Sequence, residues 1–434
     1  MKNSGVEWIG EIPDEWEVKK VKYIFSERKN KNIGTKEKNL LSLSYGKIVR
    51  KNITNMEGLI PESYETYNIL QPGDIVFRLT DLQNDKHSLR TGLCKEKGII
   101  TSAYTTVIPP KTVDPVYIHY LFHAYDNCKV FYNLGDGVRQ GMKYSDLCKL
   151  NIILPPKSTQ QRIASYLDKK CSKIEETIQN QQQVIEKLKA YKQSLITEAV
   201  TGKIKIQNGK ACGKYEEYKD SGVEWIGEIP SGWISPKISY LTTKIGSGKT
   251  PYGGAATYLN EGILFIRSQN VYDEGLTITE PLYISEEIDE EMKGTRVFDK
   301  DVLLNITGGS IGRCCVYDKK FGKANVNQHV CIIRVIQDKI LPKYMQLFWN
   351  SIIGKRAIDI YQTGGNREGM SGNAISKTVL PLPTIEEQKS IVEYLEKKCT
   401  GINNAIEQKQ NLIEKLTEYK KSLIYECVTG KKEI

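Results

Sequence analysis

The chain has 434 residues, 39% of them hydrophobic and 26% charged, and 62 lysines and arginines against 52 acidic residues give a formal net charge of +10. This length favours two or more domains, and we expect a cytoplasmic protein because no apolar run approaches the roughly 18 residues of a membrane-spanning helix and the first residues lack a secretory signal. The basic excess suits a polyanionic partner, although a solvated basic surface explains it equally well.

Ten cysteines and four histidines are dispersed along the chain without a repeated ligand spacing. We therefore expect reduced, mostly buried thiols and no zinc site. Cys314 and Cys315 are adjacent in a strand-like run, where successive side chains point to opposite faces of a sheet.

The chain opens with a motif that it later repeats. The ten residues S-G-V-E-W-I-G-E-I-P occur at Ser4–Pro13 and again, unchanged, at Ser221–Pro230. A second repeat pairs the segment from Gln160 with the segment from Gln388: Y-L-D-K-K-C matches Y-L-E-K-K-C, and both segments end in V-T-G-K. Duplication of one unit explains both matches and predicts a repeated architecture.

Two blocks of different sequence lie between the repeated segments, from about Lys19 to Ile153 and from about Ser235 to Leu380. Both contain short apolar or β-branched runs, such as Ile75–Thr80 and Val302–Thr307, which predict strands. Polar, glycine-containing segments follow these runs. Because arginine pairs with guanine or phosphate and asparagine or glutamine with adenine, these segments are candidates for DNA contact, although simple solvation explains any single residue at least as well.

Two arginines occupy matching places near the ends of the blocks, Arg139 in G-V-R-Q-G-M and Arg367 in G-N-R-E-G-M. Flanking glycines would let the backbone approach a phosphate, and an exposed structural turn is the competing explanation. The candidate DNA-contacting residues are Arg78, Thr80, Asp81, Gln83, Asn84, Lys86, Ser88, Arg90, Arg139, Gln140 and Lys143 in the first block and Ser247, Lys249, Thr250, Tyr252, Arg267, Gln269, Asn270, Ser310, Arg313, Asn325, Asn327, Gln328, His329 and Arg367 in the second.

The repeated segment Gln160–Val200 carries apolar residues at heptad spacing, and its second copy keeps the register. Such a stripe needs a partner, and we predict that the two helices pair with each other, antiparallel, within one chain. That pairing would place the two blocks at opposite ends, related by a pseudo-twofold axis. The predicted coiled-coil residues are Leu167, Ile174, Ile178, Ile185, Leu188, Leu195, Leu395, Ile402, Ile406, Ile413, Leu416 and Leu423.

Boundary signals flank both helices, each then about 40 residues or roughly 60 Å long. Capping-box spacing is present for Ser158 with Gln161 and for Thr384 with Glu387. The predicted ends are Gly202 and Gly430.

Polar residues interrupt the heptads at matching places in both helices. Such interruptions weaken a coiled coil but select its register and partner, whereas a frayed edge is the alternative explanation. They are Gln181 and Lys192 in the first helix and Lys409 and Lys420 in the second.

Three motifs resemble parts of enzyme sites but lack essential residues. G-S-G-K-T at Gly246–Thr250 ends like a phosphate-binding loop, yet Thr243 stands where that motif needs its first glycine. His119 and His123 have the spacing of a zinc-protease helix without its glutamate, and D-P-V-Y at Asp114–Tyr117 lacks the second proline of an amino-methyltransferase tetrapeptide. We therefore predict no ATP, zinc or methyltransferase site and a chain that is not an enzyme.

The doubled opening motif, the proline-rich entries Leu154–Pro156 and Leu380–Pro383, and the helices ending in V-T-G-K resemble the specificity subunits of type I restriction-modification systems. The resemblance covers essentially the whole chain, and the double occurrence of the motifs in this order makes it specific. It fits an α+β chain in which two strand-rich target-recognition domains are joined by two long helices forming an antiparallel coiled coil. The predicted limits are 1–157 and 220–383 for the recognition domains, 158–203 and 384–434 for the helices, and 204–219 for the linker.

The resemblance further implies that each recognition domain reads one half of a bipartite, asymmetric double-stranded DNA site. The helices would set the spacer between the halves and dock two modification (methyltransferase) subunits, and restriction (motor-nuclease) subunits would complete the complex. The chain itself would bind no cofactor, since S-adenosylmethionine and ATP with magnesium are expected on the partner subunits. No membrane partner is expected.

Three other functions stay open from the sequence alone. A recognition subunit of a related system, whose partner fuses methyltransferase and nuclease in one polypeptide, would have the same features. A self-contained methyltransferase or nuclease would act on DNA without partners. A coiled-coil scaffold that binds only proteins would lack DNA binding with a steep salt dependence.

Overall fold

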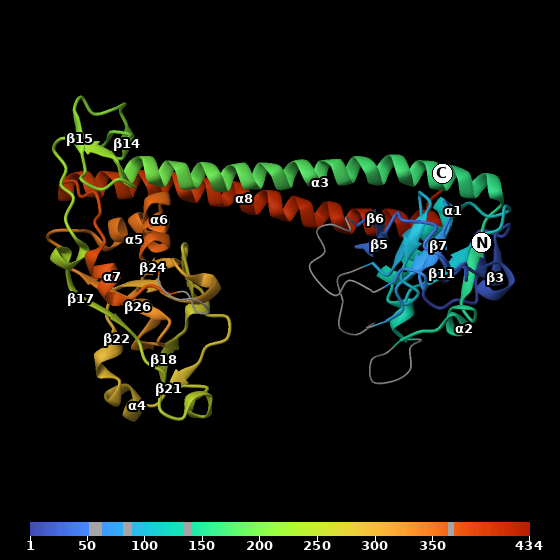
Figure 1. Ribbon diagram of the computed structural model, residues 1–434, viewed down its shortest axis with the longest axis horizontal. Helices are drawn as coiled ribbons and strands as arrows, with labels where there is room; N and C mark the ends of the chain where they lie inside the picture. The colour runs from blue at the N-terminus through green and yellow to red at the C-terminus, as the bar shows by residue number, and fades with distance from the viewer. Residues whose placement is uncertain (52–62, 81–88, 134–140, 363–368) are drawn as a thin grey trace. The chain divides into compact units, whose positions relative to one another are not determined.

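The chain folds into two compact units, of which Met1–Gln182 with Gln410–Ile434 form the first and Gln183–Lys409 the second (Figure 1). The computed structural model spans the whole chain and describes all residues except 52–62, 81–88, 134–140 and 363–368. Each unit combines short strands with helices, so the α+β tandem repeat predicted from the sequence is confirmed.

Two 44-residue helices, α3 (Lys157–Val200) and α8 (Ile385–Val428), carry the repeated heptads. In the first unit the beginning of α3 packs against the end of α8, and Leu167 and Leu423 are buried in that contact. In the second unit the end of α3 packs against the beginning of α8, where Leu395 is buried. Because beginnings meet ends in both units, the helices are antiparallel, as predicted.

The heptad residues lie on the packed faces of both helices. Seven are buried, namely Leu167, Ile174, Ile185, Leu195, Leu395, Ile402 and Leu423. Five are half-buried, namely Ile178, Leu188, Ile406, Ile413 and Leu416.

Lysines at matching heptad positions make equivalent contacts in the two units. In the first unit, Lys420 of α8 donates to Glu175 of α3, with 2.5 Å between Nζ and Oε1. In the second unit, Lys192 of α3 donates to Asn403 of α8, with 2.9 Å between Nζ and Oδ1. Burial acts to raise the pKa of Glu175, but hydrogen bonds from Lys420 and Lys47 hold it below its ordinary value. Since a lysine within an apolar seam needs an acceptor, these contacts favour one register.

Replacing Lys420 by methionine is expected to lower the free energy of unfolding by about 1–3 kcal/mol, because Glu175 would stay charged and half-buried with one of its two cations removed. Urea unfolding followed by circular dichroism measures the loss. Lys420→Arg, which keeps a charged donor, is the control, and the double change Lys420→Met with Glu175→Leu should restore most of the stability. A Lys420→Met protein as stable as the parent would show that the contact contributes nothing.

The predicted capping box is present on one helix only. At α8, the backbone N–H of Thr384 donates to the Glu387 carboxylate (3.2 Å) and the N–H of Glu387 donates to the Thr384 hydroxyl (3.3 Å). At α3 the prediction is wrong, because the helix begins one residue before Ser158, which therefore lies inside it. A buried glutamine supports the start of both helices, because Gln160 donates to the Pro155 carbonyl (2.8 Å) and Gln388 donates to the Pro383 carbonyl (3.0 Å).

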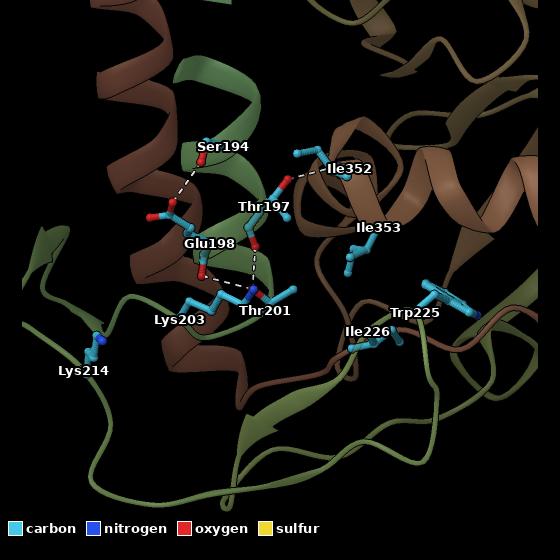
Figure 2. Close-up of a pocket in the computed structure, with 10 residues that line it drawn as sticks. All are labelled: Ser194, Thr197, Glu198, Thr201, Lys203, Lys214, Trp225, Ile226, Ile352 and Ile353. Atoms are coloured by element: carbon cyan, nitrogen blue, oxygen red, sulfur yellow. Dashed lines mark hydrogen bonds between the residues drawn. The ribbon is translucent and has the colours of Figure 1, made fainter. Parts of the chain in front are cut away.

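Both helices end at the predicted glycines, which pack against the opening motif of the same unit. Gly202 and Gly430 have φ angles of 71° and 72°, and the N–H of Lys203 closes the turn by donating to the carbonyl five residues earlier (Figure 2). A Cβ atom on Gly202 would lie 2.3 Å from Pro230 Cγ, and one on Gly430 would lie 2.4 Å from Pro13 Cδ. The two kinds of repeated segment therefore touch each other, which explains why they recur together.

The first unit is built around a four-stranded antiparallel sheet with the order β4-β11-β8-β9. Its central strand β8 is the run predicted at 75–80. The strands are β1 (Lys2–Asn3), β2 (Glu11–Ile12), β3 (Glu17–Lys20), β4 (Ser26–Glu27), β5 (Leu41–Ser44), β6 (Lys47–Arg50), β7 (Asn68–Leu70), β8 (Ile75–Phe77), β9 (Thr91–Leu93), β10 (Gly98–Ile100), β11 (Thr105–Ile108) and β12 (Asn151–Leu154), and the helices are η1 (Val21–Tyr23), α1 (Pro115–Asn127), η3 (Val130–Asn133) and α2 (Tyr144–Leu147).

The second unit has a sheet of the same topology, β17-β26-β23-β24, and a further four-stranded sheet, β21-β18-β25-β22. The predicted run at 302–307 is β23. Its strands are β13 (Ile206–Gln207), β14 (Lys210–Ala211), β15 (Tyr218–Asp220), β16 (Glu228–Pro230), β17 (Thr242–Ser247), β18 (Ile263–Ile266), β19 (Val271–Tyr272), β20 (Gly275–Leu276), β21 (Tyr283–Ile284), β22 (Arg296–Val297), β23 (Val302–Asn305), β24 (Cys314–Val316), β25 (Ala324–Val326) and β26 (Val330–Val335). Its helices, besides the long ones, are η4 (Ile238–Leu241), η5 (Gly254–Thr257), η6 (Ser268–Asn270), α4 (Glu286–Glu291), η7 (Lys293–Thr295), η8 (Gly308–Ser310), η9 (Lys319–Phe321), α5 (Pro342–Asn350), α6 (Ile352–Tyr361) and α7 (Gly372–Lys377).

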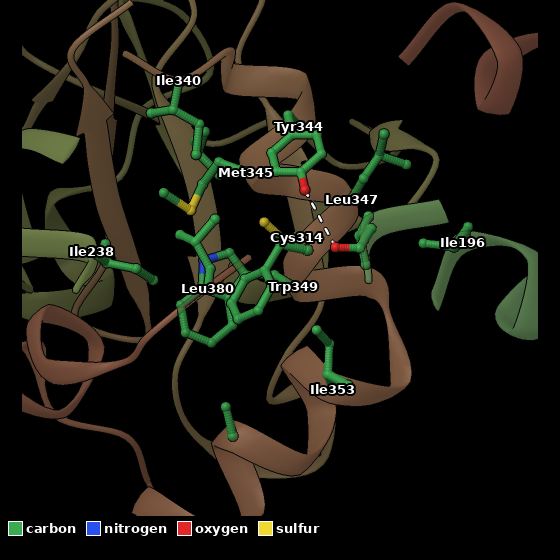
Figure 3. Close-up of a cluster of buried hydrophobic side chains, with 14 of the residues drawn as sticks. Ile196, Ile238, Cys314, Ile340, Tyr344, Met345, Leu347, Trp349, Ile353 and Leu380 are labelled. Carbon is green, nitrogen blue, oxygen red and sulfur yellow. Dashed lines mark hydrogen bonds between the residues drawn. The ribbon is translucent and has the colours of Figure 1, made fainter. Parts of the chain in front are cut away.

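Side chains alternate across this shared sheet in the second unit. Cys314 packs in the core formed with α5, beside Met345 and Trp349 (Figure 3), and Cys315 packs in the separate core shared with β18 and β25. The predicted opposite orientation of the two thiols is therefore confirmed. Burial raises the pKa of Cys315 to about 12 and that of Cys314 well above its ordinary value, so both are inert thiols.

Helices α1 and α5 occupy equivalent places in the two units. Tyr117 on α1 donates to the carbonyls of Ile153 (3.1 Å) and Val428 (3.2 Å), which precede one long helix and end the other. Tyr344 on α5 makes the same two contacts in the second unit, with Pro381 (2.9 Å) and Val200 (3.3 Å). Because Tyr117 and Tyr344 are equivalent, each residue of α1 corresponds to the residue of α5 that lies the same number of positions from its tyrosine.

Candidate nucleic-acid interface

Three loops meet at one edge of the β17-β26-β23-β24 sheet in the second unit, because β17 and β23 end where β26 begins. The N–H of Gly248 donates to the Val330 carbonyl (3.0 Å), and the N–H of Lys249 donates to the Val326 carbonyl (3.2 Å). A Cβ atom on Gly248 would lie 1.9 Å from that Val326 oxygen. The approach is thus possible only for glycine, and it holds the loop after β17 against the loop before β26.

Polar side chains join the three loops. Thr250 hydrogen-bonds to Gln328, and the Gln328 amide nitrogen lies 3.1 Å from His329 Nε2. The other ring nitrogen of His329 hydrogen-bonds to the Thr307 hydroxyl. We call the surface formed by Ser247, Lys249, Thr250, Tyr252, Thr307, Ser310, Gln328 and His329 the polar edge.

Most of the candidate residues in this unit present donors and acceptors to solvent. Tyr252 is 98% exposed at the tip of the first loop. Ser247, Lys249, Thr250, Gln269 and Gln328 are exposed, and Ser310, Arg313, Arg267 and His329 are half-exposed. The Arg313 guanidinium lies over the Tyr272 ring, 4.7 Å from its centroid, and Arg267 donates to the Glu280 carbonyl (3.3 Å). The exposed groups are of the types that pair with base edges and phosphates.

Four candidates need correction because their side chains are buried among protein partners. Asn325 has no exposed surface and donates to Asp289, and Asn270, 3% exposed, donates to the Thr277 carbonyl. Asn327 accepts from the N–H of His329. Arg90, also fully buried, donates to the Thr80 carbonyl (2.8 Å). A side chain committed in this way supports the loops and does not reach a ligand.

In the first unit, the equivalent edge follows β8. Thr80 is exposed and Arg78 is half-buried there, and Lys143 is exposed just before α2. The remaining candidates lie outside the described residues, namely Asp81, Gln83, Asn84, Lys86, Ser88, Arg139 and Gln140, together with Arg367 of the second unit.

The sequence reasoning missed two features of these edges. Thr307 directly follows β23, and its hydroxyl holds His329. Ile33, 70% exposed, precedes Gly34 (φ 73°) in the loop after β4, just as Tyr252 precedes Gly253 (φ 93°) in the loop after β17. Tyr252 is among the candidates, and the same signal, an exposed apolar residue before a glycine in the loop after the first strand of the sheet, could have identified Ile33.

Metal and membrane signatures are both missing from the described part of the chain. It contains no group of three or more His, Cys, Asp or Glu residues placed to hold a metal ion. No helix there is both long and apolar enough to cross a bilayer. The rings of His119 and His123 contact each other inside the first unit, with 4.0 Å between their centroids and an angle of 58° between their planes.

Two regions of the sequence match one family model, described as the type I restriction modification DNA specificity domain, at residues 13–189 and 230–415. The chain is 24% identical over 445 residues to a putative type I restriction enzyme MjaX specificity subunit of Methanocaldococcus jannaschii, covering 98% of this chain and 95% of that protein. It is also 24% identical over 282 residues to the EcoBI specificity subunit of Escherichia coli, covering 64% of this chain and 57% of that one.

Solved structures share the fold. A chain from a structure of the type I R-M system superposes with a TM-score of 0.71 at 13% identity, covering 97% of this chain and all of that one. The HsdS subunit from Thermoanaerobacter tengcongensis gives a TM-score of 0.50 at 12% identity over the full length of both chains. With two specificity domains in tandem and the matching fold, this chain belongs to the family of type I restriction-modification specificity subunits.

Proposed function

We propose that the chain binds double-stranded DNA and that each unit reads one half of a bipartite, asymmetric site. The helix pair serves as spacer and docks two modification subunits, and restriction subunits complete the complex. The chain carries no catalytic site, and S-adenosylmethionine, ATP and magnesium act on the partner subunits.

One observation carries this proposal: the same sheet topology recurs in both units, while the sequences of the two blocks that carry it differ. A duplicated frame with unlike loops is the arrangement expected of two readers with different targets. The polar edge adds lysine, glutamine, threonine and serine side chains held by mutual hydrogen bonds, which suits the recognition of base edges and phosphates.

Exchanging the block Lys19–Ile153 for that of a relative with a different target is expected to change one half of the methylated motif and leave the other half unchanged. Sequencing of methylated bases in cells that carry the hybrid chain with its partners reads the result. A hybrid in which both halves change would overturn independent reading. Methyl transfer by the purified chain alone, given labelled methyl donor and DNA, would overturn the assignment of catalysis to partners.

Two substitutions at the polar edge should separate base reading from phosphate contact. Gln328→Ala is expected to cost about 1–3 kcal/mol on the cognate site only, because an amide contact to a base edge is lost. Lys249→Ala is expected to weaken binding to all DNA and to reduce the slope of log Kd against log salt by about 1. Fluorescence anisotropy at several salt concentrations measures both. Binding that neither change affects would remove the polar edge from the interface, and a chain whose complex binds no DNA would be a protein scaffold.

A further inference from the structure

A pocket of about 540 Å³ opens beside the end of α3, wholly within the second unit (Figure 2). Thr197 and Thr201 of α3 line one part of the pocket, and Trp225 of the second opening motif lines another. Ile352 and Ile353 at the start of α6 line a third part. Trp225 is half-buried and Ile352 is 50% exposed, so apolar surface is left open to solvent where the two repeated segments meet α6.

The internal repeat shows what fills this space in the first unit. S-L-I-T-E-A-V-T-G-K in α3 corresponds to S-L-I-Y-E-C-V-T-G-K in α8, so Thr197 corresponds to Tyr425. The Tyr425 hydroxyl donates to the carbonyl of Trp8 (3.0 Å), with 6.4 Å between the two ring centroids. Lys431 donates to the same hydroxyl (2.9 Å). In the first unit, the Tyr425 side chain therefore contacts both Trp8 and Lys431.

A second replacement widens the pocket. Tyr125 of α1 packs edge-on against Trp8 at 4.4 Å between centroids, whereas α5 of the second unit ends at Asn350 and Ile352, the first residue of α6, lines the pocket together with Trp225. The Thr197 hydroxyl is bound within the second unit, because it donates to the Gln193 carbonyl and accepts from the N–H of Ile352. The two aromatic side chains that contact Trp8 thus have smaller residues, Thr197 and Ile352, in their place around Trp225.

We infer that this pocket binds a tyrosine side chain from a partner protein. The guest ring would pack on Trp225, and its hydroxyl would donate to the Trp225 carbonyl, as Tyr425 does with Trp8. Lys203, which corresponds to Lys431, would donate to the guest hydroxyl. Lys203 and Lys214 on the rim favour an acidic residue beside that tyrosine.

The residues that line the pocket favour a protein segment over nucleic acid as its ligand. Glu198 contributes a carboxylate to the pocket, where it accepts from the Ser194 hydroxyl (2.8 Å), and a fixed negative charge disfavours phosphate. The partner that we assign is a modification subunit, so the inference rests on the proposed function.

The test uses 4-fluorophenol as a probe of the tyrosine side chain, followed by ¹⁹F NMR on the full chain. The parent protein should bind it saturably, and Thr197→Tyr, which places in α3 the residue that α8 already accommodates, should abolish that binding. Thr197→Val removes the hydrogen bonds but leaves the space, so it should still bind the probe. Tyr425→Thr should create a second site. Unchanged melting temperatures establish that the variants fold, and a Thr197→Tyr protein that binds the probe like the parent overturns the pocket.

A second measurement addresses the partner. The Thr197→Tyr chain should assemble with its modification subunits about tenfold or more weakly than the Thr197→Val chain, because a filled pocket excludes the anchoring side chain. Equal assembly of both variants would overturn the docking role even if the probe result holds. DNA binding by the assembled parent complex is measured separately. If the complex binds no DNA, the proposed function is wrong, whereas the result with the probe is unaffected.

Discussion

Replacing Gly202 or Gly430 by alanine is expected to lower the free energy of unfolding of the unit concerned by about 2–4 kcal/mol. Both residues have φ near +70°, where a Cβ atom costs roughly 1–2 kcal/mol. The added methyl group would also overlap a proline ring of the opening motif, at 2.3 Å for Gly202 and 2.4 Å for Gly430, and overpacking adds roughly 1–3 kcal/mol. Urea unfolding of each variant measures the loss.

Gly401 provides the matched control for this prediction. It lies inside α8 and is exposed, and a Cβ atom added there would meet nothing within 4 Å. Gly401→Ala should therefore stabilise the helix by roughly 0.5–1 kcal/mol. If all three alanine variants behaved alike, the contact between helix end and opening motif would not be a source of stability.

The repeated parts of the chain could be predicted from sequence because their signals are local. Heptad spacing and the glycines that end the helices depend only on neighbours along the chain, so Leu167, Leu423, Gly202 and Gly430 are placed as expected. The capping box was predictable at Thr384 and not at Ser158. The two helices begin at equivalent positions of the repeat, Lys157 and Ile385. The residue of α3 that corresponds to Thr384 is Pro156, whose side chain has no acceptor for a capping hydrogen bond, and Ser158 lies inside the helix.

The candidate interface could be predicted only in part, because burial depends on tertiary packing. Gln328 and Asn325 lie three residues apart in one polar stretch, yet Gln328 is exposed and Asn325 has no exposed surface. Asn325 faces α4, where Asp289 accepts its amide, and no local pattern shows that this helix covers the strand. The meeting of the three loops likewise depends on the order of strands in the sheet, which is set by contacts distant in sequence.

Acidification from pH 6.5 to 4 is expected to destabilise the first unit through a buried histidine pair. His119 and His123 lie one helical turn apart on α1, and His123 Nε2 lies 2.9 Å from the Thr91 carbonyl. Burial lowers the pKa of His123 to about 4 and that of His119 well below its ordinary value, and Lys420 acts in the same direction on both. The folded unit therefore keeps both rings neutral where the unfolded chain takes up protons.

The sign of the effect follows from this difference in proton binding. Between the ordinary pKa of 6.5 and the folded value of about 4, the unfolded state binds more protons, so stability falls as the pH falls. His123 alone accounts for roughly 3 kcal/mol over that range. Urea unfolding of the parent at pH 7, 6, 5 and 4 measures the slope.

The second unit supplies the substitutions that test this account. Gln346 and Asn350 stand on α5 at the positions of His119 and His123, and both donate to the Cys314 carbonyl. The double variant His119→Gln with His123→Asn should therefore lose most of the pH dependence between 6.5 and 4, whatever its stability at pH 7. His329→Gln, on the polar edge of the other unit, should leave the profile of the first unit unchanged. A double variant with the parent's acid slope would assign that slope to carboxylates and remove the histidines from the explanation.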